Sequence, residues 1–520
     1  IMNKARYTGL ALVLGAFFFS FNTSAQVSST QIDSLVSLAM KKFNVAGVAV
    51  GVVQDGQIIH SKGYGYSNFD KKTVATEHTN FAIASNSKAF TATAMAILVE
   101  DGKLKWDDKV KSILPEFEMY NDYVTQNFTV EDLLCHRSGM GLGQGDLMWF
   151  PDGSDFKIED MLTAYRQTIP ESAVRTKMEY NNILFFIAGE VIARTSGMSW
   201  EDFIAKRIFE PAGMESSVTS ISRIGNLPLA KAHANTDGKL RVLADYEPQV
   251  NGGAAGIYAN VNDLCNWMVL NLNHGSLGEK KVFTAKTQKE HLWKIQTVTA
   301  PNGNPKYNAH FGGYGLGWFL GDMNGNLVVS HSGGMPGMLS KTTLIADKNV
   351  GIVILTNTSD DGAMVFSALT NTLVDAFVDV EPTNWIDRYE AYNKKNKAFA
   401  DSVLKAAWSK VGSGKAGLYD KKIIGTYNDY WLGDVTIENK GDKLILACTR
   451  SPKLTGQLFY YQDATYLVKW DYQDMNADAF VKFELDEKNN TLGFSLEGIS
   501  PNIDFSFDFD DLHIQRIKSK

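Results

Sequence analysis

The stretch FAIASNSKAFTATAMAILVEDGKL, residues 81–104, decides the fold and the chemistry of this 520-residue chain. Apolar residues at spacings of three and four predict a helix, and the Asp101-Gly102 pair predicts its end. The run is interpreted as amphipathic, with an apolar part made of Phe90, Ala92, Met95, Ile97 and Leu98. If the helix begins near Ser85, then Ser85 and Lys88 lie one turn apart on the same face.

Ser85 and Lys88 form an S-x-x-K pair. A serine hydroxyl is a poor nucleophile until a base takes its proton, and a lysine in a dry pocket beside other cations has a lowered pKa that suits it for this task. Backbone N–H groups at the helix start favour negative charge developing beside the serine. The same pattern also occurs at residues 154–157 and 402–405, so its meaning depends on the surrounding sequence.

Composition and cysteine usage exclude several classes of protein. The chain is 44% hydrophobic and 21% charged, as ordinary soluble globular proteins are. Its net charge of -7 gives no electrostatic footprint for a nucleic-acid partner. Cys135, Cys265 and Cys448 are too few for a disulfide scaffold, so we expect buried thiols, with a Cys135–Cys265 bridge as the alternative. No histidine or cysteine spacing matches a zinc site, and we predict no metal and no cofactor.

The N-terminal residues predict export. Lys4 and Arg6 precede the short apolar run at residues 10–21, and small residues follow at Thr23 and Ala25. This pattern predicts a signal peptide over residues 1–25, cut after Ala25. The apolar run is shorter than the ~20 residues of a membrane span, so we expect no stable span after cleavage. The protein is therefore predicted to be periplasmic or secreted in a bacterium, while its oligomeric state stays open.

The patterns along the chain predict two structured domains joined by a connector. Residues 26–380 carry strand patterns towards both ends, inside a first and a last helical pattern, and mostly helical patterns between them, which predicts a mixed α/β (α+β) domain with one sheet fed from both ends. Residues 381–416 predict a charged helical linker, and residues 417–520 predict short alternating strands in a small all-β barrel or sandwich.

Tyr180 and Asn182 form a Y-x-N pair that leads into a predicted helix. A phenol can relay a proton from serine to a leaving group if nearby cations lower its pKa. An asparagine amide can orient a substrate carbonyl and a lysine together. Y-x-N also occurs at residues 66–68 and 258–260, where we interpret the residues as structural.

An H-S-G sequence at residues 331–333 ends a predicted strand. Glycine there allows an extended substrate to approach the strand edge. We hypothesise that His331 supplies a hydrogen-bond donor, or a cation near neutral pH, to the Ser85–Tyr180 site, and a purely structural histidine carries equal weight. The backbone N–H groups of Ser85 and Gly334 are the candidates for an oxyanion hole, where one donor is typically worth ~3 kcal/mol.

The S-N-S-K, Y-N-N and H-S-G motifs, in this order, resemble those of the class C β-lactamase-like serine hydrolases. That superfamily includes penicillin-binding proteins, D-alanyl-D-alanine carboxypeptidases, D-aminopeptidases and related esterases. The fragments GYGYSN, LLCHRSGM, AAGIYANVNDL and YGLGW are similar to its secondary motifs, so the resemblance covers roughly residues 30–375. It implies an antiparallel sheet flanked by helices with an inserted helical region. The C-terminal segment resembles the lipocalin-like module that often follows this catalytic domain.

The resemblance also implies roles for the motif residues. Ser85 becomes the nucleophile that forms an acyl-enzyme, Lys88 assists as base and Tyr180 acts as acid and base. The residues implied in substrate binding are Asn182, His331, Ser332 and Gly333. His331 occupies the place where β-lactamases of this class carry the lysine of K-T-G, and histidine there is more typical of peptidases and esterases.

The leading hypothesis is an exported serine hydrolase acting on small peptides or amides, preferably with D-residues, or on esters. The alternative within enzymes is a β-lactamase. The alternative outside enzymes is a sensor protein whose pocket captures penicillins or muropeptides.

Overall fold

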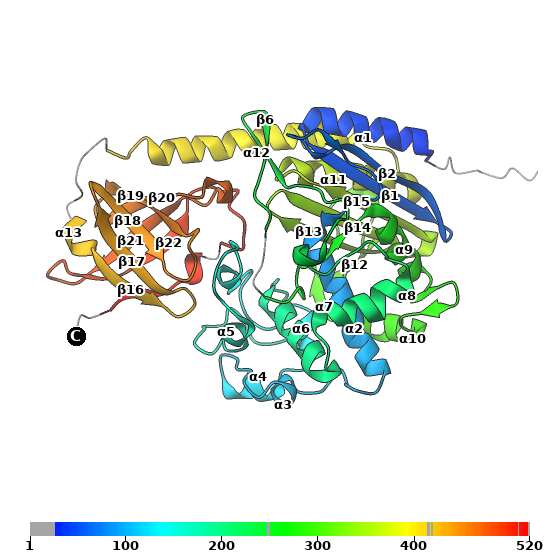
Figure 1. Cartoon of the computed structure of the whole chain (residues 1–520), viewed down its shortest axis with the longest axis horizontal. Coiled ribbons are helices and arrows are strands. Elements are labelled where there is room, and N and C mark those ends of the chain that lie inside the picture. The colour runs from blue at the N-terminus through cyan, green and yellow to red at the C-terminus, as the bar shows by residue number, and fades with distance from the viewer. Residues whose placement is uncertain (1–26, 247–249, 413–416, 418–419, 508, 518–520) are drawn as a thin grey trace, which may run out of the picture.

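The computed structural model describes residues 27–246, 250–412, 417, 420–507 and 509–517. The predicted signal peptide therefore lies outside the described residues. An α/β unit built on a large sheet stands beside a closed β-barrel (Figure 1). None of the helices in these ranges combines the length and the apolar character that a membrane span requires.

The large sheet has nine strands in the order β10-β11-β12-β13-β14-β15-β1-β2-β3, all of them paired antiparallel. Its strands are β1 (Gly47–Gln54), β2 (Gln57–Asn68), β3 (Thr73–Val74), β10 (Thr297–Thr299), β11 (Gly312–Tyr314), β12 (Phe319–Met323), β13 (Asn326–Met335), β14 (Met338–Ile345) and β15 (Val350–Thr356). The first strand pairs with the last, with Val50 opposite Ile354. The prediction of one sheet fed from both ends is confirmed.

Helices cover both faces of this sheet, because successive side chains of a strand point to opposite faces. Val50 and Ile354 pack in a core with α1 (Ser29–Phe43) and α11 (Asp361–Phe377). Ala49 and Leu355 belong to the core on the other face, with α2 (Ser87–Glu100), α6 (Ile183–Ser196) and α9 (Val261–Leu272). The long helix α12 (Trp385–Trp408) lies beside α11 and runs towards the barrel (Figure 1).

Shorter elements complete the α/β unit. The helices are α3 (Val110–Ile113), α4 (Asp122–Asn127), α5 (Ile158–Leu162), α7 (Trp200–Ile204), α8 (Glu210–Ala212) and α10 (Ala285–Thr287). The paired short strands are β4 (Phe81–Ala82) with β7 (Tyr258–Ala259), β5 (His233–Thr236) with β6 (Lys239–Val242), and β8 (Ser276–Leu277) with β9 (Lys280–Lys281).

Helix α2 differs from its prediction. Its residues from Ser87 to Leu98 are all buried, so the amphipathic interpretation is wrong. The helix lies inside the core, with α6, α7 and the sheet around it, and no face of these turns meets solvent. A 3₁₀ turn, Ala84–Asn86, precedes the helix and carries Ser85.

The C-terminal strands close into an eight-stranded barrel, which confirms the barrel alternative over the sandwich. They follow α13 (Asp420–Ile423) and are β16 (Gly425–Asp429), β17 (Gly433–Lys440), β18 (Lys443–Cys448), β19 (Thr455–Gln462), β20 (Thr465–Trp470), β21 (Ala479–Leu485), β22 (Thr491–Gly498) and β23 (Ile514–Arg516). All three cysteines are buried free thiols, as expected, and the alternative Cys135–Cys265 bridge is not formed.

The barrel docks on the segment between residues 141 and 165 of the α/β unit. The indole of Trp431 donates to the Ala164 carbonyl at 2.7 Å in a buried position. Arg450 pairs with Asp155 at 2.7 Å and with Asp160 at 3.0 Å. These contacts place the segment 141–165 between the barrel and the centre of the α/β unit.

Candidate active site

Ser85 lies on the short turn that enters α2, directly against strand β13. The preceding residue, Ala84, has a φ of 47°, a left-handed conformation that is uncommon for a residue with a Cβ and that concentrates at functional sites. A Cβ on Gly333 of β13 would lie 2.2 Å from the carbonyl oxygen of Ile83 and 2.8 Å from the backbone nitrogen of Ser85. Only glycine lets the strand and the turn meet this closely.

The Lys88 amine is the centre of a buried hydrogen-bond cluster. Its Nζ donates to Ser85 Oγ at 2.9 Å, to Asn182 Oδ1 at 2.7 Å and to the carbonyl oxygen of Ala254 at 3.1 Å. Burial lowers the pKa of Lys88 to about 7, although the negative charge of Asp146 opposes this shift. The predicted cause was wrong in part, because burial rather than neighbouring cations lowers the pKa. Near pH 7 this lysine exists partly as the neutral base.

Tyr180 interacts with Ser85, which opposes part of the rise in the tyrosine pKa, and its ring centroid lies 5.0 Å from Lys88 Nζ. The predicted convergence of the serine, lysine, tyrosine and asparagine is therefore present. The expectation that cations lower the pKa of Tyr180 is wrong: burial raises that pKa above its usual value, and Asp146 raises it further. The phenol consequently holds its proton at rest and is available as an acid.

Asn182 connects Lys88 to a carboxylate that the sequence did not point to. The amide immediately precedes α6, accepts from Lys88 through Oδ1 and donates through Nδ2 to Asp146 Oδ2 at 2.7 Å. Asp146 is fully buried and also accepts from Trp149 Nε1 at 3.0 Å and from Ser506 Oγ at 2.8 Å.

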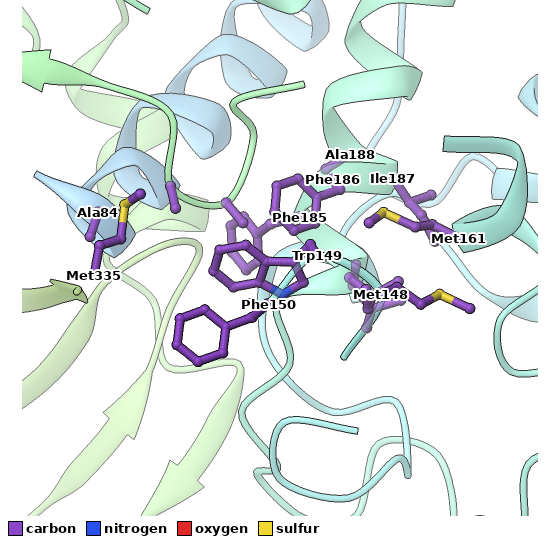
Figure 2. Close-up of a cluster of buried hydrophobic side chains, with 14 of the residues drawn as sticks. Ala84, Met148, Trp149, Phe150, Met161, Phe185, Phe186, Ile187, Ala188 and Met335 are labelled. Carbon is purple, nitrogen blue, oxygen red and sulfur yellow. The ribbon is translucent and has the colours of Figure 1, made fainter. Parts of the chain in front are cut away.

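Burial raises the pKa of the Asp146 carboxyl to about 6, and the three hydrogen bonds limit this rise. In the sequence, Asp146 stands out only as a single acidic residue within the GQGDLMWF run, and this pattern does not indicate its contact with Asn182. Trp149, which donates to this carboxylate, packs against α6: its ring centroid lies 5.3 Å from that of Phe186 (Figure 2).

His331 has a different role from the predicted one. Its Nδ1 lies 2.6 Å from the Ser332 carbonyl oxygen, so Nδ1 carries the hydrogen and Nε2 accepts from the Tyr314 hydroxyl at 3.0 Å. Burial lowers the pKa of His331 to about 3. Of the two forms that the sequence left open, donor or cation, the cation is therefore wrong, and both ring nitrogens of His331 have partners other than Ser85. The uncharged ring of His331 borders the site, with its centroid 6.3 Å from that of Tyr180.

His136 is a second buried histidine that sequence reasoning missed as a site residue. Its ring lies 4.2 Å from Tyr180 and 4.5 Å from Tyr314, centroid to centroid. Its Nδ1 accepts the backbone N–H of Asn181 at 3.1 Å, which ties the ring to the Y-x-N segment. Burial and the nearby Lys88 charge hold the pKa of His136 well below its usual value, so this ring is neutral too.

Strand β13 presents an open edge beside Ser85. Strand β12 pairs with it only as far as Ser330, whereas pairing with β14 continues to Met335. In the described part of the chain, residues 331–335 thus have no strand partner on the β12 side. An extended substrate can add to such an edge through main-chain hydrogen bonds. Gly334 is exposed on this stretch, and Ser332 lies opposite Lys341 of β14.

The other matches to the motifs are structural. Ser154 donates to the Met148 carbonyl at 2.8 Å, and Ser402 donates to the Phe399 carbonyl within α12 at 2.7 Å. Asn260 caps α9 by accepting the backbone N–H of Asp263. Within the described ranges, no group of three or more His, Cys, Asp or Glu side chains is arranged to hold a metal ion.

Comparison with known proteins agrees with this geometry. The profile of the Beta-lactamase family matches residues 32–376. The chain belongs to this family. Its members include hydrolases, and the protein is accordingly a serine hydrolase of the Beta-lactamase family. A second profile, for a domain of unknown function designated DUF3471, matches residues 421–516 and covers the barrel.

Two curated relatives illustrate the range of this similarity. The unguisins hydrolase ungD' of Aspergillus campestris is 27% identical over 382 residues, covering 72% of this chain and 70% of the relative. The protein flp of Staphylococcus aureus is 26% identical over 339 residues, covering 64% of each chain.

Solved structures share the fold. A penicillin-binding protein homologue from Pyrococcus abyssi, described as octameric, aligns with a TM-score of 0.58 and 20% identity, covering 91% of this chain and 98% of that one. A penicillin-binding protein from Bacillus halodurans aligns with a TM-score of 0.54 and 21% identity, covering 65% of this chain and 98% of that one.

Replacing Asp146 by asparagine should move the acid limb of the pH profile. The carboxylate raises the pKa of Lys88, so its loss should lower that pKa and shift the acid limb of kcat/KM for a small ester to lower pH. Asp155→Asn is the matched control, since that exposed carboxylate pairs with Arg450 away from the site. An unchanged acid limb in the asparagine variant would show that Asp146 does not affect the pKa of Lys88.

Gly333→Ala should push β13 away from the Ser85 turn. The new Cβ would meet backbone atoms that have no room to give, and a displacement near 1 Å at a reacting group costs about 100-fold in rate. Gly321→Ala on β12 is the control, because its nearest contact would be an ordinary 3.4 Å. Steady-state kinetics checks both variants, and equal activity in the two would contradict the close approach.

Proposed function

We propose that this protein is an exported hydrolase that forms an acyl-enzyme through Ser85 with small peptides or amides, preferably containing D-residues, or with esters. The observation that carries the proposal is the 2.9 Å hydrogen bond between Lys88 Nζ and Ser85 Oγ at a site where burial lowers the lysine pKa to about 7. A general base with a pKa near the working pH combines a usable neutral fraction with the strength to take a proton.

The acylation step follows from the positions of three groups. Neutral Lys88 takes the proton of Ser85 as Oγ bonds to the substrate carbonyl carbon. The backbone N–H groups of Ser85 and Gly334 are proposed to hold the resulting oxyanion, each worth ~3 kcal/mol. As the carbon–nitrogen or carbon–oxygen bond breaks, Tyr180 gives its proton to the leaving group and recovers one from Lys88.

Deacylation reverses the proton path with water in place of the leaving group. Lys88, neutral again once Tyr180 has recovered its proton, takes a proton from the water as the water oxygen attacks the acyl carbon. The ester bond to Ser85 then breaks, and the serine oxygen recovers a proton from the same cluster. The 2.9 Å hydrogen bond between Lys88 Nζ and Ser85 Oγ and the interaction of Tyr180 with Ser85 support this path.

The neutral His331 bears on the choice of substrate. Penicillins and peptides with a free C-terminus bring a carboxylate, which a cation at the strand edge would attract. With its pKa lowered to about 3, His331 offers no such charge. This favours neutral amides, esters and peptides held by their main chain over efficient β-lactam hydrolysis. The relative named as a hydrolase of unguisins supports hydrolysis as the reaction class.

Export rests on the N-terminal pattern of Lys4 and Arg6, an apolar run and small residues before position 26. We infer a periplasmic or secreted location from it. N-terminal sequencing of the protein recovered from the periplasm or the medium tests this, and it should begin at Gln26.

Ser85→Ala should abolish both turnover and covalent labelling while keeping the fold, because only one hydroxyl is lost. Intact-mass measurement across a panel of D-peptides, esters and β-lactams should detect acyl adducts only in the protein that retains Ser85. Rapid steady turnover of a chromogenic β-lactam would favour the β-lactamase alternative. A permanent adduct with no turnover of any panel member would favour the sensor alternative.

Tyr180→Phe should reduce kcat by ~10²–10⁴-fold, the usual worth of a positioned proton transfer. The ring and its contact with His136 remain, so the melting temperature should change little. Stopped-flow kinetics with an activated ester, whose leaving group needs no proton, should show a smaller loss than kinetics with an amide. Equal losses for both substrates would remove Tyr180 from the step that protonates the leaving group.

A further inference from the structure

A loop of the C-terminal barrel reaches the catalytic cluster of the α/β unit. It joins β22 to β23, and it approaches the α/β unit where the two parts stand side by side (Figure 1). Within it, Phe505 lies edge-on to Tyr180 with ring centroids 5.9 Å apart. The next residue, Ser506, is buried and donates to Asp146 Oδ2 at 2.8 Å. A side chain of the barrel thus touches a carboxylate that belongs to the site.

A continuous set of hydrogen bonds leads from this serine to the nucleophile. Asp146 Oδ2 accepts from both Ser506 Oγ and Asn182 Nδ2, at 2.8 and 2.7 Å. Asn182 Oδ1 accepts from Lys88 Nζ at 2.7 Å, and Lys88 Nζ donates to Ser85 Oγ at 2.9 Å. Three segments of the α/β unit, which carry Asp146, Asn182 and Lys88, and one segment of the barrel contribute to this path.

The direction of these hydrogen bonds shows how Asp146 fixes the orientation of the Asn182 amide. An ionised carboxylate can only accept, so Asp146 requires the NH₂ end of the Asn182 amide. The carbonyl end must then face Lys88, where the amine needs an acceptor. If the Asn182 amide were flipped, its NH₂ group would face the Lys88 amine, and two hydrogen-bond donors would oppose each other. The ionised form of Asp146 therefore orients Asn182, and a hydrogen bond donated to a carboxylate favours that form.

The barrel loop is fixed in a way that keeps Ser506 in place. Asp511 accepts from Gln144 Nε2 at 3.0 Å, and the Phe507 ring lies 5.0 Å from that of Phe150. Docking of the barrel itself relies on other contacts, such as the buried bond from Trp431 to the Ala164 carbonyl. The hydroxyl of Ser506 is directed to the site rather than to the docking surface.

We propose that Ser506 is a positioning residue of the active site: it fixes the Asp146 carboxylate that orients Asn182 towards Lys88, and the barrel thereby completes the catalytic cluster. The inference rests on the proposed role of Lys88 as the base that serves Ser85. It assigns the C-terminal domain a part in the reaction, and it explains why a buried serine stands at this point of the loop.

The test is a double-mutant cycle measured on the full chain with an activated ester. Ser506→Ala should lower kcat about 10-fold, the worth of a hydrogen bond to a charged group, with KM changed less than about twofold. In an Asp146→Ala background the same substitution should change kcat less than about twofold, because its acceptor is gone. Tyr430→Phe is the matched control: it removes one hydroxyl bond of the same interface, to the Thr163 carbonyl, and should leave kcat unchanged.

Two outcomes overturn the inference. One is an unchanged kcat in Ser506→Ala, and the other is an equal loss in the presence and absence of the Asp146 carboxylate, which would mean that Ser506 only supports docking. If alanine lowers the melting temperature, Ser506→Cys keeps the volume and weakens the donor, so it repeats the test in a folded protein. Turnover that survives Ser85→Ala would instead refute the proposed function, so the two failures are distinguishable.

Discussion

The buried amine of Lys88 is the constraint on which the rest of the site depends. Moving an amine out of water is costly unless its donors find acceptors. The chain meets this requirement with a hydroxyl, a side-chain amide and a main-chain carbonyl, from Ser85, Asn182 and Ala254. These acceptors come from three separate segments, so α2 has to lie inside the core with α6 and a glycine-rich loop against it. The same burial supplies the lowered pKa that the chemistry needs.

Close backbone approach is the second requirement, and glycine provides it. A Cβ on Gly253 would lie 2.3 Å from the carbonyl oxygen of Phe185 in α6, so glycine here lets the neighbouring Ala254 carbonyl reach Lys88. On the other side, a Cβ on Gly317 would lie 2.7 Å from the carbonyl oxygen of Lys88 itself. Together with Gly333 against the Ser85 turn, these positions allow main chain to surround the start of α2 on several sides.

Most of the side chains that surround Ser85 are electrically neutral. His136 and His331 are both neutral because burial disfavours their charged forms, and Tyr180 keeps its proton for the same reason. The Asp146 carboxylate joins this cluster through Asn182, and the hydrogen bonds that it accepts counter the rise in its pKa that burial causes. A low-dielectric site of this kind strengthens each remaining interaction, which makes the placement of a single donor such as Ser506 matter.

The sequence by itself determined the local elements and the residues of the candidate site. Periodicity and turn residues predicted the helix after Ser85, the sheet fed from both ends and the separate barrel, because the spacing of apolar residues along each segment reflects its secondary structure. The S-x-x-K and Y-x-N motifs pointed to Ser85, Lys88, Tyr180 and Asn182, which the fold brings together.

Only the tertiary structure decided the environment of these residues. Burial of α2 on all sides, the neutral state of His331 and the raised pKa of Tyr180 follow from which segments exclude water, and no local pattern records that. The contact between Asp146 and Ser506 joins residues 360 positions apart. Such a contact depends on how two domains dock, and a pKa depends on the dielectric and the charges that docking creates. That is the physical reason why sequence patterns could name the reacting groups but not their electrostatics.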